Sequence, residues 1–197
     1  MTIAQRIRLL SCIIPLLSGC SLFSVQTGPT HTYILEKVPE NIPLRANHHV
    51  ILGVTIPSTS PVYNTTDMIY STYPYQVASF AKNSWVATPP QMLQPLIVRT
   101  LQNTHYFAAV KTTVMGKSDY ILNTELLELQ QDFKRNPSVV RVRIRADIVR
   151  AATNQLVRSK EFDVVEPAPQ NSPYGGVIAA NQATAEALAQ LAWFCVK

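Results

Sequence analysis

The chain has 197 residues, of which 47% are hydrophobic and 15% are charged. This composition is sufficient for one domain with a real core, and it excludes an intrinsically disordered protein. The net charge of +5 falls to +3 without residues 1–19, because 15 basic and 12 acidic side chains remain. So mild an excess argues against a nucleic-acid-binding protein, which should show a strong basic patch with interleaved aromatic residues.

The first 19 residues have the pattern of a secretory signal peptide. A basic start with Arg6 and Arg8 precedes a nine-residue apolar run at 9–17, which Pro15 interrupts. A membrane-spanning helix needs about 20 apolar residues, so this run is too short to be one. We therefore expect residues 1–19 to be removed from the mature protein.

The end of this segment, Leu17-Ser18-Gly19-Cys20, matches the bacterial lipobox. Cleavage between Gly19 and Cys20 frees an amine that takes an acyl chain such as palmitate, and the Cys20 thiol carries a diacylglycerol. Two or more acyl chains anchor a protein stably to a membrane, whereas one does not. The alternative is a plain buried cysteine behind an ordinary signal peptide. Ser21, and not an aspartate, follows the cysteine, which in lipoproteins of this kind implies export to the outer membrane.

The cysteine count excludes a disulfide scaffold in the mature chain. Cys12 lies in the signal peptide and acylation consumes Cys20, so Cys195 is left without a partner.

A tether and several short strands are expected next. Residues 21–32 are polar and lack periodicity, which predicts a tether of at most about 40 Å after the lipidated cysteine. The folded domain is then expected at 33–197. Strands are predicted at 33–36, 50–56, 68–71 and 76–81, the last two flanking Pro74.

The first helix is predicted at about 88–103. Thr88 is a suitable N-cap and Pro89 a suitable first residue. Pro95 is expected to kink this helix or to confine its regular part to the residues that follow. Apolar residues recur at helical spacing and predict one buried face, made of Met92, Leu93, Leu96, Ile97, Thr100 and Leu101.

The second half of the chain predicts a meander of strands and a final helix. A short strand at 107–114 precedes long strands at 120–133, 140–148 and 155–165. Strict alternation of apolar and charged residues at 140–148 is typical of a half-buried antiparallel strand. An alanine-rich stretch predicts a helix at 176–195. Its predicted buried face is made of Val177, Ala180, Thr184, Ala187, Leu188 and Leu191. This order predicts an α+β single domain, with a mainly antiparallel sheet packed by two helices at about 88–103 and 176–195.

No catalytic or metal-binding motif is present in the sequence. His48 and His49 are adjacent and would point to opposite sides of a strand, which suits a shared metal poorly. Glu125 and Glu128 differ in parity, so they face opposite ways unless a bulge intervenes, and no general acid–base pair is marked. We therefore expect no enzyme activity, no metal and no cofactor other than the covalent diacylglycerol and N-acyl chain on Cys20.

Two groups of side chains are candidates for binding. Arg141, Arg143 and Arg145 share one face of a predicted strand over roughly 14 Å, and this stripe suits an anionic lipid or an acidic partner. The alternative is a solvated sheet face on which they pair with Glu and Asp of neighbouring strands. The second group is aromatic and forms either core or an exposed partner-binding tip: Tyr70, Tyr73, Tyr75, Phe80 and Trp85.

Two stretches of the sequence follow a known pattern: MIYSTYPYQVASFAKNSWVATPPQMLQPLIVRTLQNTHYFAAV from residue 68 and PYGGVIAANQA at 173–183. With them, residues 50–197 resemble the ABC-type transport auxiliary lipoproteins, the PqiC/YmbA-like group. Leu127, Leu129, Asp132-Phe133 and Pro137 also match the pattern, in the same order and spacing. Ser84 departs from it, because such proteins often carry a basic residue there.

The resemblance implies an outer-membrane lipoprotein, facing the periplasm, that works with an MCE-type ABC system moving lipids between the inner and outer membranes. It implies MCE-domain and ABC transporter subunits as partners, a homo-oligomeric ring as one arrangement, and no nucleic acid. Two other roles stay open. One is a lipoprotein that carries lipid or glycolipid itself, which needs an apolar cavity, and the other is a structural lipoprotein of another envelope machine.

Overall fold

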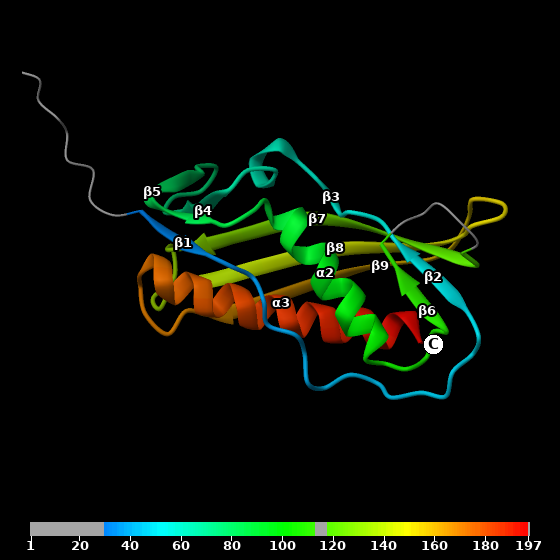
Figure 1. The fold of residues 1–197 in the computed structure, drawn as a ribbon. Helices are drawn as coiled ribbons and strands as arrows, with labels where there is room; N and C mark the ends of the chain where they lie inside the picture. Colours follow the sequence, from blue (N-terminus) through cyan, green and yellow to red (C-terminus); the bar gives the residue numbers. More distant parts are fainter. Residues whose placement is uncertain (1–29, 113–117, 197) are drawn as a thin grey trace, which may run out of the picture.

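The computed structural model of the chain describes residues 30–112 and 118–196 (Figure 1). The signal peptide, the lipobox with Gly19 and Cys20, and most of the tether lie outside the described residues, so those interpretations stay predictions. Within the described part, no helix is both long enough and apolar enough to cross a membrane.

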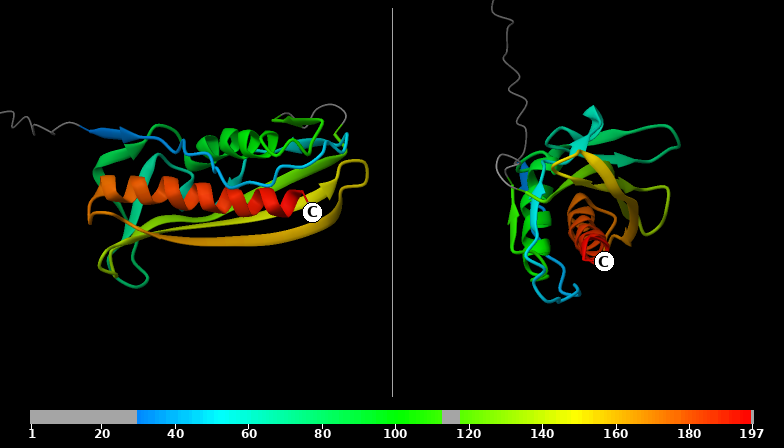
Figure 2. Two further views of the ribbon diagram at one scale, coloured as in Figure 1. Left: turned by 90° about the horizontal axis from the view of Figure 1, so that it is seen from below. Right: turned by 90° about the vertical axis from the view of Figure 1, so that its right-hand side faces the viewer.

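The described chain forms a single α+β domain from a mixed sheet and two helices, as the sequence predicts. The sheet of nine strands curves around the helices (Figure 2). The elements in chain order are β1 (His31–Tyr33), β2 (Ile51–Val54), β3 (Ser58–Thr59), the 3-10 helix η2 (Pro61–Tyr63), β4 (Asp67–Ser71), β5 (Ala78–Trp85), α2 (Pro89–Gln102), β6 (Ala109–Lys111), β7 (Tyr120–Asp132), β8 (Val139–Arg150), β9 (Gln155–Pro167) and α3 (Pro173–Cys195).

The sheet is mixed: its long strand pairs are antiparallel, as predicted, but several short strands pair parallel. The predicted meander is confirmed, because β7, β8 and β9 pair antiparallel along most of their lengths. The other edge of β7 is shared by β2, β3 and β4, which pair with it one after another, all parallel. The chain from β2 to β4 advances in the same direction as β7, and the long connection through α2 supplies the crossover that parallel pairing requires.

Helix α3 lies between α2 and the strands β8 and β9 (Figure 2). The predicted buried face is confirmed, since Val177, Ala180, Leu188 and Leu191 are all buried. Much of the rest of its surface is also buried, because a helix covered from two directions must be apolar over most of its circumference, although Ile178 and Glu186 lie on a stripe that stays exposed. These further buried residues are Ala179, Ala185, Ala189, Ala192 and Phe194.

Helix α2 begins after Thr88 with Pro89, as predicted, and its whole predicted apolar face is buried. The backbone N–H of Thr88 donates to Oε1 of Gln91 at 3.1 Å. The expectation that Pro95 confines the helix is wrong, because the helix runs through it. Pro95 lies on the exposed side, where the carbonyl of Gln91, which loses its helical partner, is open to water.

The first strand is displaced from its predicted position. It covers His31–Tyr33 and pairs parallel with β5, so the domain begins two residues before its predicted start at residue 33. Residues 34–37 do not extend the strand, because their backbone forms hydrogen bonds with the Asn181 side chain of α3. Its Oδ1 accepts from the N–H groups of Glu36 and Lys37 at 2.9 and 3.1 Å, and its Nδ2 donates to the Ile34 carbonyl at 3.1 Å.

Helix α3 begins three residues before its predicted start. Ser172 is the N-cap, and its side-chain oxygen accepts from the backbone N–H of Gly175 at 3.0 Å. Pro173 occupies the first helical position, where its fixed φ suits the helix and its missing N–H costs nothing. The last proline of the connection between β9 and α3 is therefore the first residue of the helix.

Candidate interaction surfaces

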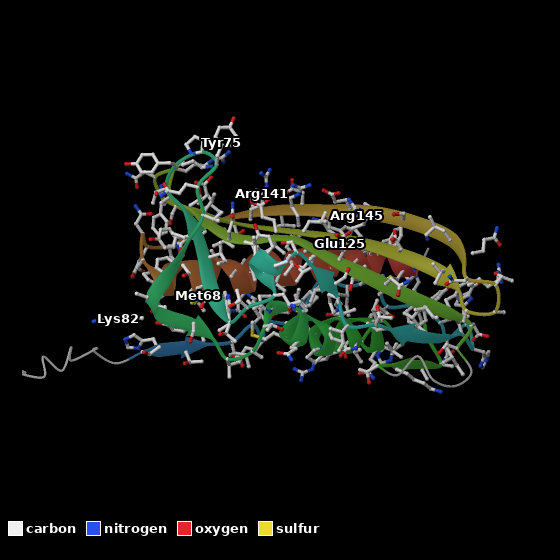
Figure 3. All side chains as sticks on the ribbon, turned by 90° about the horizontal axis from the view of Figure 1, so that it is seen from above. Met68, Tyr75, Lys82, Glu125, Arg141 and Arg145 are labelled. Atoms are coloured by element: carbon white, nitrogen blue, oxygen red, sulfur yellow. The ribbon has the colours of Figure 1, made fainter. Side chains whose placement is uncertain are left out.

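Arg141, Arg143 and Arg145 lie in a row on the outer face of β8, as the alternation predicts (Figure 3). Each has a carboxylate close to it on a neighbouring strand. The Nε of Arg141 lies 2.9 Å from Oδ1 of Asp163, and Nη1 of Arg145 lies 2.8 Å from Oε2 of Glu125. We call this network of arginines and carboxylates the ion-pair ladder.

Arg143 holds the centre of the ion-pair ladder. Its Nη2 lies 2.6 Å from Oε1 of Glu161, and its Nη1 lies 3.7 Å from Oε2 of Glu128. Glu161 also reaches Arg145, with 3.5 Å between Oε2 and Nη2. The arrangement is the solvated, paired sheet face that the sequence left open as the alternative. The three arginines face four carboxylates, so the surface has no excess of positive charge, and contact with an anionic partner stays a prediction.

A β-bulge explains why Glu125 and Glu128 lie on the same face. The register of β7 against β8 shifts between Leu126 and Glu128, which places both glutamates opposite arginines. An extra residue in one strand reverses the alternation of faces beyond it. From the sequence, a bulge was the condition under which Glu125 and Glu128 would share a face. Its position could not be predicted, because nothing distinguishes Leu127 from its apolar neighbours.

The ion-pair ladder shifts the pKa values of its carboxyls in opposite directions. The hydrogen bond from Arg143 lowers the pKa of Glu161. Burial raises the pKa of Glu128, although Arg141 and Arg143 oppose this shift. Burial also raises the pKa of Tyr63, to about 12, and the nearby Glu128 adds to this. A neutral Tyr63 hydroxyl therefore donates to Oε1 of Gln130 at 3.2 Å throughout the physiological range.

The aromatic group divides between core and surface. Trp85 is only 5% exposed and belongs to the core, whereas Tyr73 and Tyr75 are 68% and 110% exposed. The two tyrosines stand at the turn between β4 and β5, with Tyr75 projecting from the body (Figure 3). We call this turn the hairpin tip. Trp85 is thus a core residue, whereas Tyr73 and Tyr75 form an exposed tip, and binding of a partner at this tip stays a prediction.

A small aromatic cluster supports the hairpin tip from below. Tyr70 and Phe80 stack at 4.4 Å between ring centroids, and Phe133 meets the two rings edge-on at 5.8 and 6.2 Å. Aromatic pairs in these geometries add stability beyond their buried area. The base of the hairpin is therefore fixed, and Tyr73 and Tyr75 are presented on a defined support.

A second exposed apolar surface lies where the described chain begins. Tyr33 and Tyr174 approach at 6.0 Å between ring centroids, and around them Ile34, Val86 and Ile178 are 43–56% exposed. Together they line a shallow groove of about 970 Å³ between β1 and the first half of α3. We call it the N-terminal groove. This groove was not predicted from the sequence, although Tyr174 and Ile178 are four residues apart and lie outside the predicted buried face of α3.

The histidines do not form a metal centre in the described residues. His48 stacks on Tyr106 at 4.5 Å between ring centroids, while His49 has a φ of 57° and its N–H donates to Asn47. Across residues 30–112 and 118–196, no three His, Cys, Asp or Glu side chains gather in a way that suits a metal ion.

This α+β architecture places the chain with proteins of known structure. The domain is similar to the crystal structure of protein XCC0632 from Xanthomonas campestris, at 18% identity and a TM-score of 0.73, covering 85% of this chain and 94% of that one. It is also similar to a crystal structure of an uncharacterized protein, at 15% identity and a TM-score of 0.70, covering 85% and 99%. These likenesses establish the fold. A comparison with curated proteins gives no match.

The family follows from the sequence itself. Residues 33–192 match the family model described as the ABC-type transport auxiliary lipoprotein component. The chain therefore belongs to this family, as its resemblance predicts. The family is one of lipoproteins and is defined by transport and not by a reaction, which places the protein in the cell envelope, attached to a membrane.

Proposed function

We propose that this chain is an outer-membrane-anchored adaptor lipoprotein, which works in the periplasm with an MCE-type ABC system for lipid transport between the inner and outer membranes. The observation that carries the proposal is the family match over residues 33–192. An auxiliary component of a transporter needs surfaces for partners and no catalytic centre. The exposed hairpin tip and N-terminal groove suit that requirement.

The anchor supports the proposal because it would hold the domain near the membrane. Nine residues, 21–29, lie between Cys20 and residue 30, where the described structure begins. Fully extended, the chain from Cys20 to residue 30 spans at most about 35 Å. The N-terminal groove and the hairpin tip lie at the same end of the molecule as β1 (Figures 1 and 3). Both surfaces would therefore be kept close to the anchor.

The hairpin tip is the surface that we assign to the transporter partner. Tyr73 and Tyr75 expose large rigid rings at a cost of few rotatable bonds, and tyrosine is enriched among the residues that dominate binding energy. Neither ring contributes to the core, so their exposure has no role in folding. A partner with a complementary pocket would bury both.

Co-purification from membranes tests the proposal. A tagged wild-type protein is expected to sediment with membranes and to capture MCE-domain and ABC transporter subunits after mild detergent extraction. Cys20→Ala should release the protein from the membrane fraction. The double variant Tyr73→Ser with Tyr75→Ser should stay in the membrane and lose the partners.

The matched control is Leu44→Ser, which removes an apolar side chain that is 67% exposed in another part of the domain. It should keep both membrane attachment and partners. The proposal fails if Cys20→Ala stays membrane-bound, or if the wild-type protein captures no transporter subunit. Capture of a different envelope assembly would favour the structural lipoprotein alternative.

A further inference from the structure

The strands β7, β8 and β9 extend beyond the C-terminal end of α3 (Figure 2). At this end the helix no longer covers the inner face of the sheet. A cavity of about 270 Å³ remains between the sheet, the helix end and the loop before β6. We call it the distal pocket, and its main lining residues are Tyr106, Phe107, Tyr120, Ile148, Val157 and Arg158.

The distal pocket has an apolar floor and aromatic walls. Leu52 and Ile148 form the floor and are 1% and 8% exposed, while Val157 at the mouth is 43% exposed. The rings of Tyr106 and Phe107 meet edge-on at 5.0 Å and form one wall. Apolar side chains thus line a concave space from several elements, which is how small-molecule sites are usually built.

One cation faces this apolar space. The half-buried Arg158 lies over the ring of Phe194, with 4.5 Å between its Cζ and the ring centroid. Burial raises the pKa of the Cys195 thiol on the pocket wall to about 12, and Arg158 opposes that shift, so the guanidinium acts on the pocket interior.

The charges at this end differ from those of the ion-pair ladder. Within the described ranges, Arg158 forms no ion pair, and neither do Arg150 and Arg45. The Cζ of Arg150 lies 5.5 Å from the ring centroid of Tyr120, and the Cζ of Arg45 lies 5.4 Å from that of Trp193. The distal end therefore presents guanidinium groups that have aromatic neighbours but no carboxylate within about 4 Å among the described residues, whereas each ladder arginine has a carboxylate within about 3 Å.

We propose that the distal pocket binds a small anionic amphiphile with a single short alkyl chain. The chain would lie among the rings of Tyr106, Phe107 and Tyr120, and the anionic group would meet Arg158. The volume of about 270 Å³ decides against a larger ligand, because sites for drug-sized molecules span roughly 300–1,000 Å³. A two-chain phospholipid does not fit. This inference stands on the pocket alone and does not depend on the proposed function.

Calorimetric titration with decanoate, below the concentration at which it forms micelles, tests the inference. The chain from Ser21 is suitable, because it contains every described element and the whole core but no acyl anchor. We expect saturable binding of one decanoate per chain. Decanol, which lacks the charge, and acetate, which lacks the chain, should each bind at least tenfold more weakly, since a hydrogen bond to a charged group and burial of the alkyl chain each contribute that much.

Three variants distinguish binding in the distal pocket from non-specific attraction of decanoate to basic side chains. Arg158→Gln should weaken decanoate binding at least tenfold. Val157→Asp, at the exposed mouth, should weaken it similarly while leaving the core untouched. Lys160→Gln is the matched control, because it removes a cation from the same strand, over the ring of Phe162. It should leave the affinity within twofold. The proposal is overturned if decanoate does not bind saturably, if decanol binds as tightly, or if Lys160→Gln weakens binding as much as Arg158→Gln.

Discussion

Two glycines at the start of α3 allow it to approach the rest of the domain closely. A Cβ on Gly175 would lie 2.1 Å from the carbonyl oxygen of Gln170, and one on Gly176 would lie 2.1 Å from Oε1 of Gln131. Gln131 is buried and its Nε2 donates to Ser138 at 2.9 Å, so it has little freedom to move. The glycines are required at these positions by the space available.

Gly175→Ala should therefore destabilise the domain by about 1–3 kcal/mol, the usual cost of forcing extra atoms into a packed site. Helix propensity alone predicts the opposite sign, because alanine is favoured over glycine by about 1 kcal/mol inside a helix. Urea unfolding measures the difference. Glu186→Ala, at an exposed position of the same helix, is the control and should change stability by less than about 0.5 kcal/mol. Unchanged or increased stability of Gly175→Ala would contradict the packing argument.

The two central glutamates of the ion-pair ladder should respond oppositely to neutralisation. The pKa of Glu161 is lowered in the folded chain, so its charge stabilises the fold above the unfolded pKa of about 4.3, and this is lost as the pH falls through the folded pKa. The pKa of Glu128 is raised, so its ionisation weakens the fold as the pH rises above about 4.3. Glu161→Gln should lower, and Glu128→Gln should raise, the urea midpoint at pH 7.

Measuring the urea midpoints of the wild type and of both variants at low pH provides the control. Below the folded pKa of Glu161 both carboxyls are protonated in the wild type, so the midpoints of all three proteins should converge. A shift of the same sign for both variants at pH 7, or one that persists at low pH, would show that charge is not the cause.

At the scale of elements, the sequence predicts what many residues encode together. The alternation in β8 and the helical spacing in α2 each involve at least six positions, and both elements are found as predicted. The parallel pairing of β2, β3 and β4 with β7 could not be predicted, because short strands carry no signal for their direction or partner. The end of β1 depends on one distant side chain, Asn181, which no local pattern reveals.

The same limit applies to the candidate surfaces. The sequence groups five aromatic residues between 70 and 85, but only the pairing of β4 with β5 places Trp85 inside and Tyr73 and Tyr75 at the turn. The distal pocket could not be predicted from the sequence either. It exists because β7 to β9 extend beyond the end of α3, and the relative placement of these elements is known only from the folded structure.

The division of the aromatic group predicts different costs for two substitutions. Trp85→Ala should lower the free energy of unfolding by about 3–5 kcal/mol, because it opens a cavity in the core. Tyr75→Ala should change it by less than about 0.5 kcal/mol, because that ring is fully exposed. Chemical denaturation of both variants checks this. A large loss for Tyr75→Ala would mean that the hairpin tip supports the fold and is not free for a partner.

At the scale of the whole molecule, the described domain has two different ends. The end that contains β1 carries the hairpin tip and the N-terminal groove, and the opposite end carries the distal pocket (Figures 1 and 2). The core connects them through α3, which runs from one end to the other. A partner at the anchored end and a small ligand at the far end could thus bind at the same time, because the two surfaces share no residue.

The position at which the tether ends and the domain begins gives the last prediction. Residues 31–37 belong to the domain, since β1 pairs with β5, Leu35 is only 3% exposed in the core, and Asn181 holds the backbone that follows. A chain that begins at residue 30 should unfold at the same urea concentration as one that begins at Ser21. A chain that begins at Val38 should lose at least about 2 kcal/mol, the smallest usual cost of removing a buried leucine. Equal stability of all three chains would move the boundary of the domain and lengthen the tether, so that the N-terminal groove would no longer be held close to the anchor.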